Sequence, residues 1–386
     1  MKNAKLKEIL LVAGEALFLA GITTLAVLPV SCKITEQGIR LVGGDYVPPV
    51  LKNFLVKDEQ TLSLEFSEKV TVKGFVLSKV IDDKFDSEES SFTTQLSPAL
   101  ERASGIYGAV ACSLVYDEEK EPLLLSFILE EEMEIGLGYE LYLKVMDSVG
   151  NTLTLAIPFQ GYNSRLAELM ITEVQTESVS SQNKAEKEAG IYRNEYVEFL
   201  VLKGGNLSGL ELCSGYDGEA KKYLFPPVEV ETGQVFLVHM RNRGNGCISE
   251  EADDLALASA SYTSPQIRDL WTDIESTTLG NKTDIIIVRN RADQRLLDAL
   301  MYRSSSVLEW TKTMIDYSQL LDDSVIYESG GIENAFIADS LTSTKTLHRL
   351  DADFYRSAAL ANKLESFPIP SSAESWTIAE PSPGTL

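Results

Sequence analysis

The sequence predicts an all-β protein built from two antiparallel β-sandwiches, with short helical insertions in the second. Short runs in which apolar and polar residues alternate recur along the chain, and this period of two is typical of half-buried strands. Clusters of glycine, proline and asparagine separate the runs, as turn residues do. A chain of 386 residues, 44% of them hydrophobic, is long enough for two domains with buried cores.

The first 31 residues have the composition of a secretory signal peptide. Three lysines lie within the first seven residues, and the segment from Ala16 to Val30 is apolar or small. A cationic start, a short apolar segment and a small residue before the cut are the parts of such a signal. The segment is shorter than the roughly 20 residues that span a bilayer. The alternatives to a lipoprotein signal are a plain signal peptide, an uncleaved anchor and a cytosolic start helix. The sequence therefore predicts an exported protein with a signal peptide over residues 1–31.

Cys32 stands directly after the predicted cleavage position. The closing residues Leu28-Pro29-Val30-Ser31-Cys32 resemble a bacterial lipoprotein signal, in which the cysteine thiol takes a diacylglyceryl group. The resemblance implies lipidation at Cys32 and a membrane-anchored lipoprotein of the cell envelope, on the periplasmic face or at the cell surface. Residues 32–47 would then form a tether ahead of the first domain.

A first β-sandwich is predicted over residues 48–160. Strands are expected at residues 62–66, 123–129, 141–145 and 153–157. Asp147 and Asn151 bound a turn, and turn-making outweighs cation binding as their role. Pro48-Pro49-Val50, the strand end Phe66-Ser67-Glu68-Lys69-Val70 and this hairpin together resemble a bacterial Ig-like module. The resemblance implies a spacer or a binding domain.

A second β-sandwich is predicted over residues 168–386. Strands are expected at residues 169–174, 194–200, 207–212, 235–239, 284–288 and 296–302. These motifs resemble, in their order, the lamin-tail domain, an Ig-like β-sandwich, and Lys345-Thr346-Leu347-His348-Arg349, Trp376 and Ser382-Pro383-Gly384 fit its closing part. The joint from Gly161 to Arg165 should be open to proteolysis.

Two helical stretches are expected within the loops of the second domain. Apolar residues recur at three and four positions over Val307, Trp310, Met314, Tyr317 and Leu321. A second stretch runs from Asp353 to Leu364, with Phe354, Ala358, Ala361 and Leu364 expected on its apolar stripe. Their polar faces carry no motif, so we interpret them as packed covers on the sandwich.

The chain is strongly acidic, with 58 acidic and 34 basic residues and a formal net charge of −24. Such a chain repels phosphate backbones, so we expect poor binding of nucleic acid. Arg289, Arg291 and Arg295 form the densest basic candidate. Because Asp293 and Asp298 interrupt it, we interpret these charges as serving solubility and protecting a sheet edge, with a small basic patch as the alternative.

Three cysteines besides Cys32 do not make a disulfide framework. Cys112 lies in an apolar run and is expected to be buried. Cys213 and Cys247 fall in one predicted domain. They could form a disulfide in an oxidising compartment, or remain thiols.

No catalytic or metal-binding motif stands out. The chain has two histidines, His239 and His348, and neither belongs to a metal-ligand spacing or a nucleophile motif. Glu173, Glu195 and Glu198 match positions of the lamin-tail pattern, and we expect them to support the sheet. The acidic clusters Asp117-Glu118-Glu119 and Glu250-Glu251-Ala252-Asp253-Asp254 lack calcium-site spacing.

We therefore predict no catalytic residues, no metal and no cofactor. The sequence favours an exported, lipid-anchored envelope protein that acts as a non-enzymatic binding or structural module. Its expected partners are the membrane, through the lipid anchor, and an envelope protein or other extracytoplasmic ligand, but no nucleic acid. The alternative is an accessory module of an envelope hydrolase or nuclease system, because bacterial lamin-tail domains are often joined to such enzymes. A catalyst with carboxylates in the inserted loops is a third hypothesis.

Overall fold

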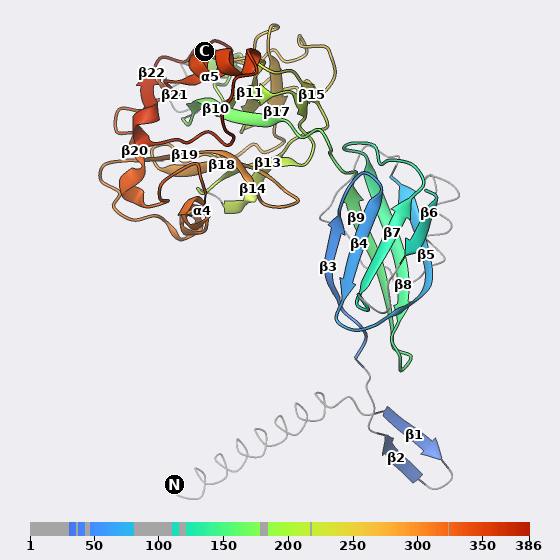
Figure 1. Cartoon of the computed structure of the whole chain (residues 1–386). Coiled ribbons are helices and arrows are strands. Elements are labelled where there is room, and N and C mark those ends of the chain that lie inside the picture. The colour runs from blue at the N-terminus through green and yellow to red at the C-terminus, as the bar shows by residue number, and fades with distance from the viewer. Residues whose placement is uncertain are drawn as a thin grey trace, which may run out of the picture.

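Strands dominate the computed structural model of the chain (Figure 1). It describes residues 31–35, 38–42, 47–80, 110–115, 121–177, 184–216, 218–322 and 324–386. Residues 1–30 of the predicted signal peptide and the cluster Asp117-Glu118-Glu119 lie outside the described residues. Within these described residues, three short α-helices accompany the strands: α3 (Lys184–Glu188), α4 (Lys312–Asp322) and α5 (Ala352–Leu360). The all-β prediction is therefore confirmed.

The segment expected as a tether contains a β-hairpin. Strand β1 (Ser31–Thr35) pairs antiparallel with β2 (Gly38–Val42), and Cys32 lies opposite Leu41. For this hairpin the structure describes the backbone alone. None of the described helices is long and apolar enough to cross a membrane.

Residues 51–160 form two antiparallel sheets that share one core. The four-stranded sheet has the order β3-β4-β7-β6 and the three-stranded sheet the order β5-β8-β9. Their bounds are β3 Leu51–Val56, β4 Thr61–Phe66, β5 Thr71–Lys79, β6 Cys112–Val115, β7 Leu124–Leu129, β8 Gly138–Met146 and β9 Thr152–Gln160. Leu64 and Phe127 of the first sheet pack with Leu141 and Leu143 of the second, and all four are buried.

The hairpin between β8 and β9 is held by its first residue. Oδ1 of Asp147 accepts hydrogen bonds from the backbone N–H groups of Val149, Gly150 and Asn151, at 2.9, 2.7 and 2.8 Å. The side-chain amide of Asn151 donates to the other carboxylate oxygen at 2.7 Å. The carboxylate of Asp147 thus satisfies the turn backbone, which agrees with the turn-making role that we expected.

Residues 168–379 form two larger sheets. The six-stranded sheet has the order β17-β16-β11-β10-β21-β22, the five-stranded sheet the order β14-β13-β18-β19-β20, and β12 pairs with β15. The bounds are β10 Glu168–Gln175, β11 Tyr196–Lys203, β12 Gly205–Asn206, β13 Leu210–Ser214, β14 Gly218–Leu224, β15 Glu229–Val230, β16 Val235–His239, β17 Arg268–Trp271, β18 Asp284–Asn290, β19 Leu296–Arg303, β20 Phe336–Ile337, β21 Thr346–Arg349 and β22 Trp376–Ala379.

Two strand pairs depart from the antiparallel arrangement that we predicted. β17 pairs parallel with β16, and β20 pairs parallel with β19. In both cases a long loop separates the partners and brings the chain back to the same end of the sheet. A parallel pair needs such a crossover, which a tight hairpin cannot provide.

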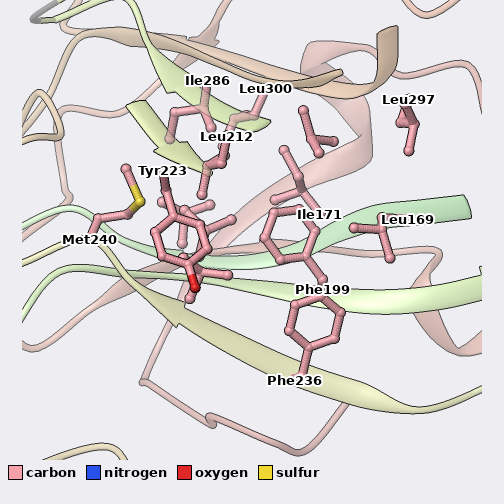
Figure 2. Packing of buried hydrophobic residues seen from close by; sticks show 14 of the residues in the cluster. Leu169, Ile171, Phe199, Leu212, Tyr223, Phe236, Met240, Ile286, Leu297 and Leu300 are labelled. Atoms are coloured by element: carbon pink, nitrogen blue, oxygen red, sulfur yellow. The ribbon is translucent and has the colours of Figure 1, made fainter. Parts of the chain in front are cut away.

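The main core lies between these two sheets (Figure 2). Ile171, Phe199 and Phe236 face it from the six-stranded sheet, while Leu212 and Ile286 face it from the other. Each of these side chains is fully buried. The outer faces are also apolar, because α4 covers the five-stranded sheet through Met314, Tyr317 and Leu321, and α5 covers the six-stranded sheet through Ala352 and Ala359.

The expected position of the first helix is close to the observed one, but the apolar stripe of the second was wrong. Helix α4 buries Met314, Tyr317 and Leu321, as predicted. Helix α5 instead buries Ala352 and Ala359, while Phe354 is 68% exposed. Small residues let this helix lie close to β11, and the larger Phe354 points away. Two single 3-10 turns, η1 (Ile332–Asn334) and η2 (Ala373–Ser375), complete the described helical elements.

The joint between the two sandwich regions is held by hydrogen bonds. The side-chain amide of Asn163 donates to the carbonyl oxygens of Asn206 and Ser208, at 2.9 and 2.7 Å. Gly136 has a φ of +75°, and a Cβ there would lie 2.2 Å from Cβ of Pro227. A glycine therefore permits both the turn and the close approach of the two regions. The domain boundaries at residues 48–160 and 168–386, and the Ig-like and lamin-tail assignments, stay predictions.

Candidate functional site

A polar pocket of about 670 Å³ lies at the end of the six-stranded sheet where β16 and β17 begin. Its walls come from the turn before β16, the start of β17, the loop before it and helix α5. The lining residues are Glu229, Val230, Glu231, Thr232, Gly233, Gln234, Asp253, Arg268, Arg356 and Leu360. This volume falls in the range of small-molecule sites.

Arg268 is the most buried charged residue of the pocket wall, with 6% of its surface exposed. Its Nη1 donates to the carbonyl oxygen of Glu250 and, at 2.6 Å, to that of Ala252. Its Nε is buried and has no hydrogen-bond partner within the described part of the chain. Burial lowers the pKa of Arg268, and the nearby Glu250 and Asp253 charges oppose this effect. The guanidinium is thus anchored on one side and unsatisfied at Nε.

Arg356 brings a second guanidinium to the pocket from α5. Its Nε donates to the carbonyl oxygen of Gly233 at 3.0 Å, which ties the helix to the turn before β16. Gly233 has a φ of +83°, and a Cβ there would lie 2.7 Å from a methyl carbon of Leu360. The turn can therefore approach α5 closely only with glycine at this position.

The three acidic residues of the pocket are not equivalent. Glu229 is paired, because it accepts hydrogen bonds from both terminal nitrogens of Arg165, at 3.0 and 2.8 Å, and from Asn206 at 2.9 Å. Glu231 and Asp253 also line the pocket, and the charges of Glu250 and Asp253 act on Arg268. No group of three acidic, histidine or cysteine side chains in the described residues is arranged to hold a metal ion.

Glu173 and Glu198, two of the glutamates singled out in the sequence, lie opposite each other on β10 and β11. Glu173 accepts hydrogen bonds from Tyr196 and from the N–H and hydroxyl of Ser382. Glu198 accepts from Thr172 at 2.7 Å and from the N–H of Gly384 at 2.6 Å. Burial, with a further contribution from the Glu173 charge, raises the pKa of Glu198 to about 8.

These contacts show the structural role of the closing segment Ser382-Pro383-Gly384. Ser382 and Gly384 use backbone N–H groups to satisfy two buried carboxyl groups, and the segment lies over the outer side of β10 and β11. Both carboxyl groups are sealed inside the protein rather than presented to a substrate. Glu195, the third matching glutamate, is also buried and accepts from the N–H of Thr278 at 3.1 Å. The arrangement is that of sheet support.

His239 forms a buried pair with Asp269, which the sequence did not reveal. Nε2 of His239 lies 2.7 Å from Oδ1 of Asp269, and the imidazole stacks on Trp271 with ring centres 3.8 Å apart. His239 and Asp269 are both 0% exposed. A substrate cannot reach this pair in the described structure, so its geometry does not serve acid–base catalysis. His348 lies elsewhere, where its Nε2 is 2.6 Å from the hydroxyl oxygen of Thr346.

Cys213 and Cys247 are not joined by a disulfide in the structure. Cys213 lies on β13 and faces the apolar cluster beneath α4. Cys247 lies in the loop after β16, within 3.8 Å of the side-chain amide of Asn194. Cys213 therefore lies in the five-stranded sheet, whereas Cys247 lies in the loop between β16 and β17 of the other sheet. Cys112 is half-buried on β6.

We expected Arg289, Arg291 and Arg295 to protect a sheet edge, and this placement was wrong. β18, which carries Arg289, is an inner strand of its sheet. Arg289 is buried and its Nε lies 2.7 Å from Glu211. Lys222 and Arg291 approach the same carboxylate, at 3.3 and 4.0 Å. Arg289 and Glu211 thus form a buried ion pair, with the half-buried Lys222 and Arg291 beside it, whereas Arg295 is exposed. In the cluster Glu250 to Asp254, Glu250 points inward and accepts from the N–H of Asp269 at 2.8 Å.

A second, smaller pocket of about 330 Å³ lies at the joint between the two regions. Phe159 and Tyr162 line it from one side, and Asn290 and Arg291 from the other. Nη1 of Arg291 donates to the side-chain oxygen of Gln160 across this joint at 3.3 Å. The contact helps to hold the two regions together.

Comparison with known proteins gives one family and one distant relative. The family model described as "TP_1001_2nd: protein second domain" matches residues 167–378, more than half of the chain. An uncharacterized protein of Treponema pallidum (strain Nichols) is 25% identical over 234 residues, which are 59% of this chain and 54% of that protein. The match therefore spans about half the length of this relative.

Among solved structures, two matches show the level of similarity. The N-terminal part of the bacterial S-layer protein SbsC is 12% identical with a TM-score of 0.22, over 67% of this chain and 44% of that chain. A DUF4876 family protein from Bacteroides thetaiotaomicron VPI-5482 is 8% identical with a TM-score of 0.29, over 73% of this chain and 83% of that chain. Scores at this level carry no argument about fold or function.

Proposed function

We propose that this chain, which belongs to the family described as "TP_1001_2nd: protein second domain", is a lipid-anchored protein of the cell envelope. It acts there as a non-enzymatic binding or structural module. The observation that carries the proposal is Cys32 at the end of a basic and then apolar N-terminal segment.

The packing of the titratable side chains supports a role without catalysis. Glu173 and Glu198 are covered by the closing segment, and His239 and Asp269 are fully buried. The polar pocket beside Arg268 and Arg356 is instead open to solvent and lies at the end of the six-stranded sheet. Fixed polar groups on a rigid support favour binding.

The charge distribution supports a partner other than nucleic acid. The net charge is −24, and the densest basic cluster shares its charge with Glu211. A phosphate backbone would meet mostly repulsive surface. The proposed partners are therefore the membrane, through the lipid, and an extracytoplasmic ligand.

Lipidation can be tested by expressing the full chain and Cys32→Ala in a bacterial host that modifies lipoproteins. We expect the wild type to enter the detergent phase and to carry acyl chains on an N-terminal Cys32. Two chains hold a protein firmly in a membrane, whereas one is marginal. Cys32→Ala should stay unprocessed or remain in the aqueous phase.

Cys112→Ala is the matched control, since it removes a thiol that is half-buried on β6. It should partition as the wild type does. Mass spectrometry of the mature N-terminus decides the outcome. An unmodified residue other than Cys32 at that position would refute the lipid anchor.

A further inference from the structure

We propose that residues 380–386, which we call the strap, open and close over the outer side of β10 and β11 in response to pH. The strap is closed while Glu173 and Glu198 carry at most one negative charge between them, and it opens when both are ionised. The inference goes beyond the proposed function, because it concerns a moving part of the second sandwich region and holds whether or not Cys32 is lipidated. It is carried by the alignment of the strap with a row of titratable side chains.

His348, Glu173 and Glu198 form this row across three neighbouring strands. Glu173 of β10 lies opposite His348 of β21 on one side and opposite Glu198 of β11 on the other. Side chains directly opposite each other in antiparallel strands share one face of the sheet and lie close together. Nε2 of His348 is accordingly 3.7 Å from Oε1 of Glu173. The same Nε2 lies 3.0 Å from the carbonyl oxygen of Glu380, the first residue of the strap.

The two carboxyl groups hold the strap at its next alternate residues. Glu173 accepts from the N–H of Ser382 at 3.2 Å, and Glu198 accepts from the N–H of Gly384 at 2.6 Å. Gly384 has a φ of +81°, and a Cβ there would lie 2.7 Å from Cδ1 of Ile267. The strap can therefore approach the loop before β17 this closely only with glycine at this position. Under the strap, Glu173 and Glu198 are each 1% exposed.

Two carboxylates side by side in a sealed site oppose each other's ionisation. Like charges directly opposite on paired strands repel, and burial penalises each charged form. Burial is the main cause that raises the pKa of Glu198 to about 8, and the Glu173 charge adds to it. At neutral pH the pair therefore shares one proton under the strap.

Rising pH favours the open strap. Opening admits water to both carboxyl groups, so the pKa of Glu198 falls back toward its ordinary value of 4.5. Between the two pKa values, the closed state holds a proton that the open state releases. The equilibrium constant for opening should therefore increase with pH, by at most about tenfold per pH unit for this single group.

Other ionisable groups near the carboxyl pair are Tyr196, Tyr262, Arg193 and Glu186, and the buried pair of His239 with Asp269. Burial raises the pKa of both tyrosines, so they stay neutral where Glu198 titrates. Arg193 and Glu186 pair with each other at 3.2 Å. On the β16 side, Glu198 lies opposite the apolar Leu237. His348 is the competing candidate, because histidine is the residue type that ordinarily changes charge near neutral pH.

The test measures hydrogen–deuterium exchange of the full chain by mass spectrometry between about pH 6 and 9, relative to an unfolded peptide at each pH. Peptides with Ser382 and Gly384 report opening of the strap. Peptides with Phe225, whose N–H donates to the carbonyl oxygen of Leu210 at 3.1 Å, report unfolding of the sandwich. We expect strap protection to fall at least about tenfold over this range while Phe225 stays better protected at every pH. Strap protection that does not change with pH, or a parallel loss in both peptides, would overturn the proposal.

Glu198→Gln removes the titrating group and can still accept the hydrogen bond of Gly384. Strap protection in this variant should no longer depend on pH. Glu380→Gln is the matched control, because it removes an exposed glutamate of the strap itself, and it should keep the slope of the wild type. A wild-type slope in Glu198→Gln would refute the role of this carboxyl group.

Two further variants separate the alternatives. His348→Gln keeps a hydrogen-bond donor and should keep the pH slope; a slope lost there and retained in Glu198→Gln would assign the response to the histidine and contradict the proposal. Gly384→Ala places a Cβ against Ile267 and should leave the strap open at every pH, while Phe225 stays protected. A strap that remains protected in Gly384→Ala would show that the segment does not close in the way proposed.

Discussion

Arg349 of β21 holds Asp298 of β19 in a buried ion pair, through a single guanidinium nitrogen, that joins the two sheets of the larger sandwich. Nη1 of Arg349 lies 3.1 and 2.9 Å from the two carboxylate oxygens, and both side chains are at most 1% exposed. The N–H of Ile171 donates to the same carboxylate at 2.7 Å. Nη2 of Arg349 donates to the carbonyl oxygen of Pro370 at 3.1 Å.

Arg349→Met should destabilise the protein by about 3–5 kcal/mol, because it leaves the Asp298 carboxylate buried without its partner. The double variant Asp298→Leu with Arg349→Met removes both charges and should recover most of this loss. Urea unfolding of the wild type, the two single variants and the double variant measures the coupling. A double variant as unstable as the sum of the singles would contradict the interpretation.

The protein should lose stability as the pH rises from about 4.5 to about 8. Burial raises the pKa of Glu198 to about 8, and the pKa values of Glu195 and Asp284 to about 7. Between the unfolded and folded pKa values, the native state holds protons that the unfolded chain releases, so unfolding becomes easier with rising pH. Each group can contribute at most about 1.4 kcal/mol per pH unit. Thermal melts between pH 4.5 and 8.5 measure the slope.

Glu198→Gln should flatten this slope, because glutamine can still accept the hydrogen bond of Gly384 but does not titrate. The matched control is Glu365→Gln, an exposed glutamate near α5. Its slope should equal that of the wild type. A Glu198→Gln slope equal to that of the wild type would show that this carboxyl group does not titrate in the expected range.

The joint between the sandwich regions should resist trypsin, contrary to what its sequence predicts. The carbonyl oxygen of Arg165 accepts from the N–H of Asn206 at 2.7 Å, and the next residue, Leu166, bridges to the same strand. A protease needs this backbone extended and unpaired. Asn163→Ala removes three hydrogen bonds, two to the carbonyl oxygens of Asn206 and Ser208 and one from the N–H of Arg165, and should expose the bond after Arg165. Mass spectrometry of fragments after brief digestion measures it, and rapid cleavage there in the wild type would contradict the expectation.

The cysteines should react in a set order. Burial raises the pKa of the Cys112 thiol to about 11 and also raises that of Cys247. Because the thiolate is the reactive form and little of it is present at neutral pH, both cysteines should react slowly. Cys213, fully buried under α4, should react with iodoacetamide only after unfolding. Peptide mapping at neutral pH measures the labelling. A peptide in which Cys213 is bonded to Cys247 would contradict the structure.

The strands of both regions were predictable because burial on one face of a sheet leaves an alternating trace. Residues 62–66 and 235–239 coincide with β4 and β16 to within one residue. Asp298 was also visible in the sequence as the one acid within an apolar run, and a lone buried charge needs a partner. Its partner could not be identified, because Arg349 lies 51 residues away.

The polar pocket could not be predicted for the same reason. Glu231, Asp253, Arg268 and Arg356 lie in four separate segments, and none belongs to a local motif. Their meeting depends on the loop that makes β17 parallel to β16. The predicted stripe of α5 was wrong because it was placed on the face of Phe354 and Leu364, whereas the helix packs on β11 through Ala352 and Ala359.

The pairing of β10 with β21 has a consequence for how the chain is made. β10 lies between β11 and β21, and its buried Glu173 accepts a hydrogen bond from Ser382 near the end of the sequence. The partners of β10 on that side are synthesised late, since Ser382 lies 209 residues after Glu173. Folding that depends on such distant contacts is slow. The second domain should therefore reach its native state only after translation has passed residue 384, and until then the nascent chain must be kept from aggregating.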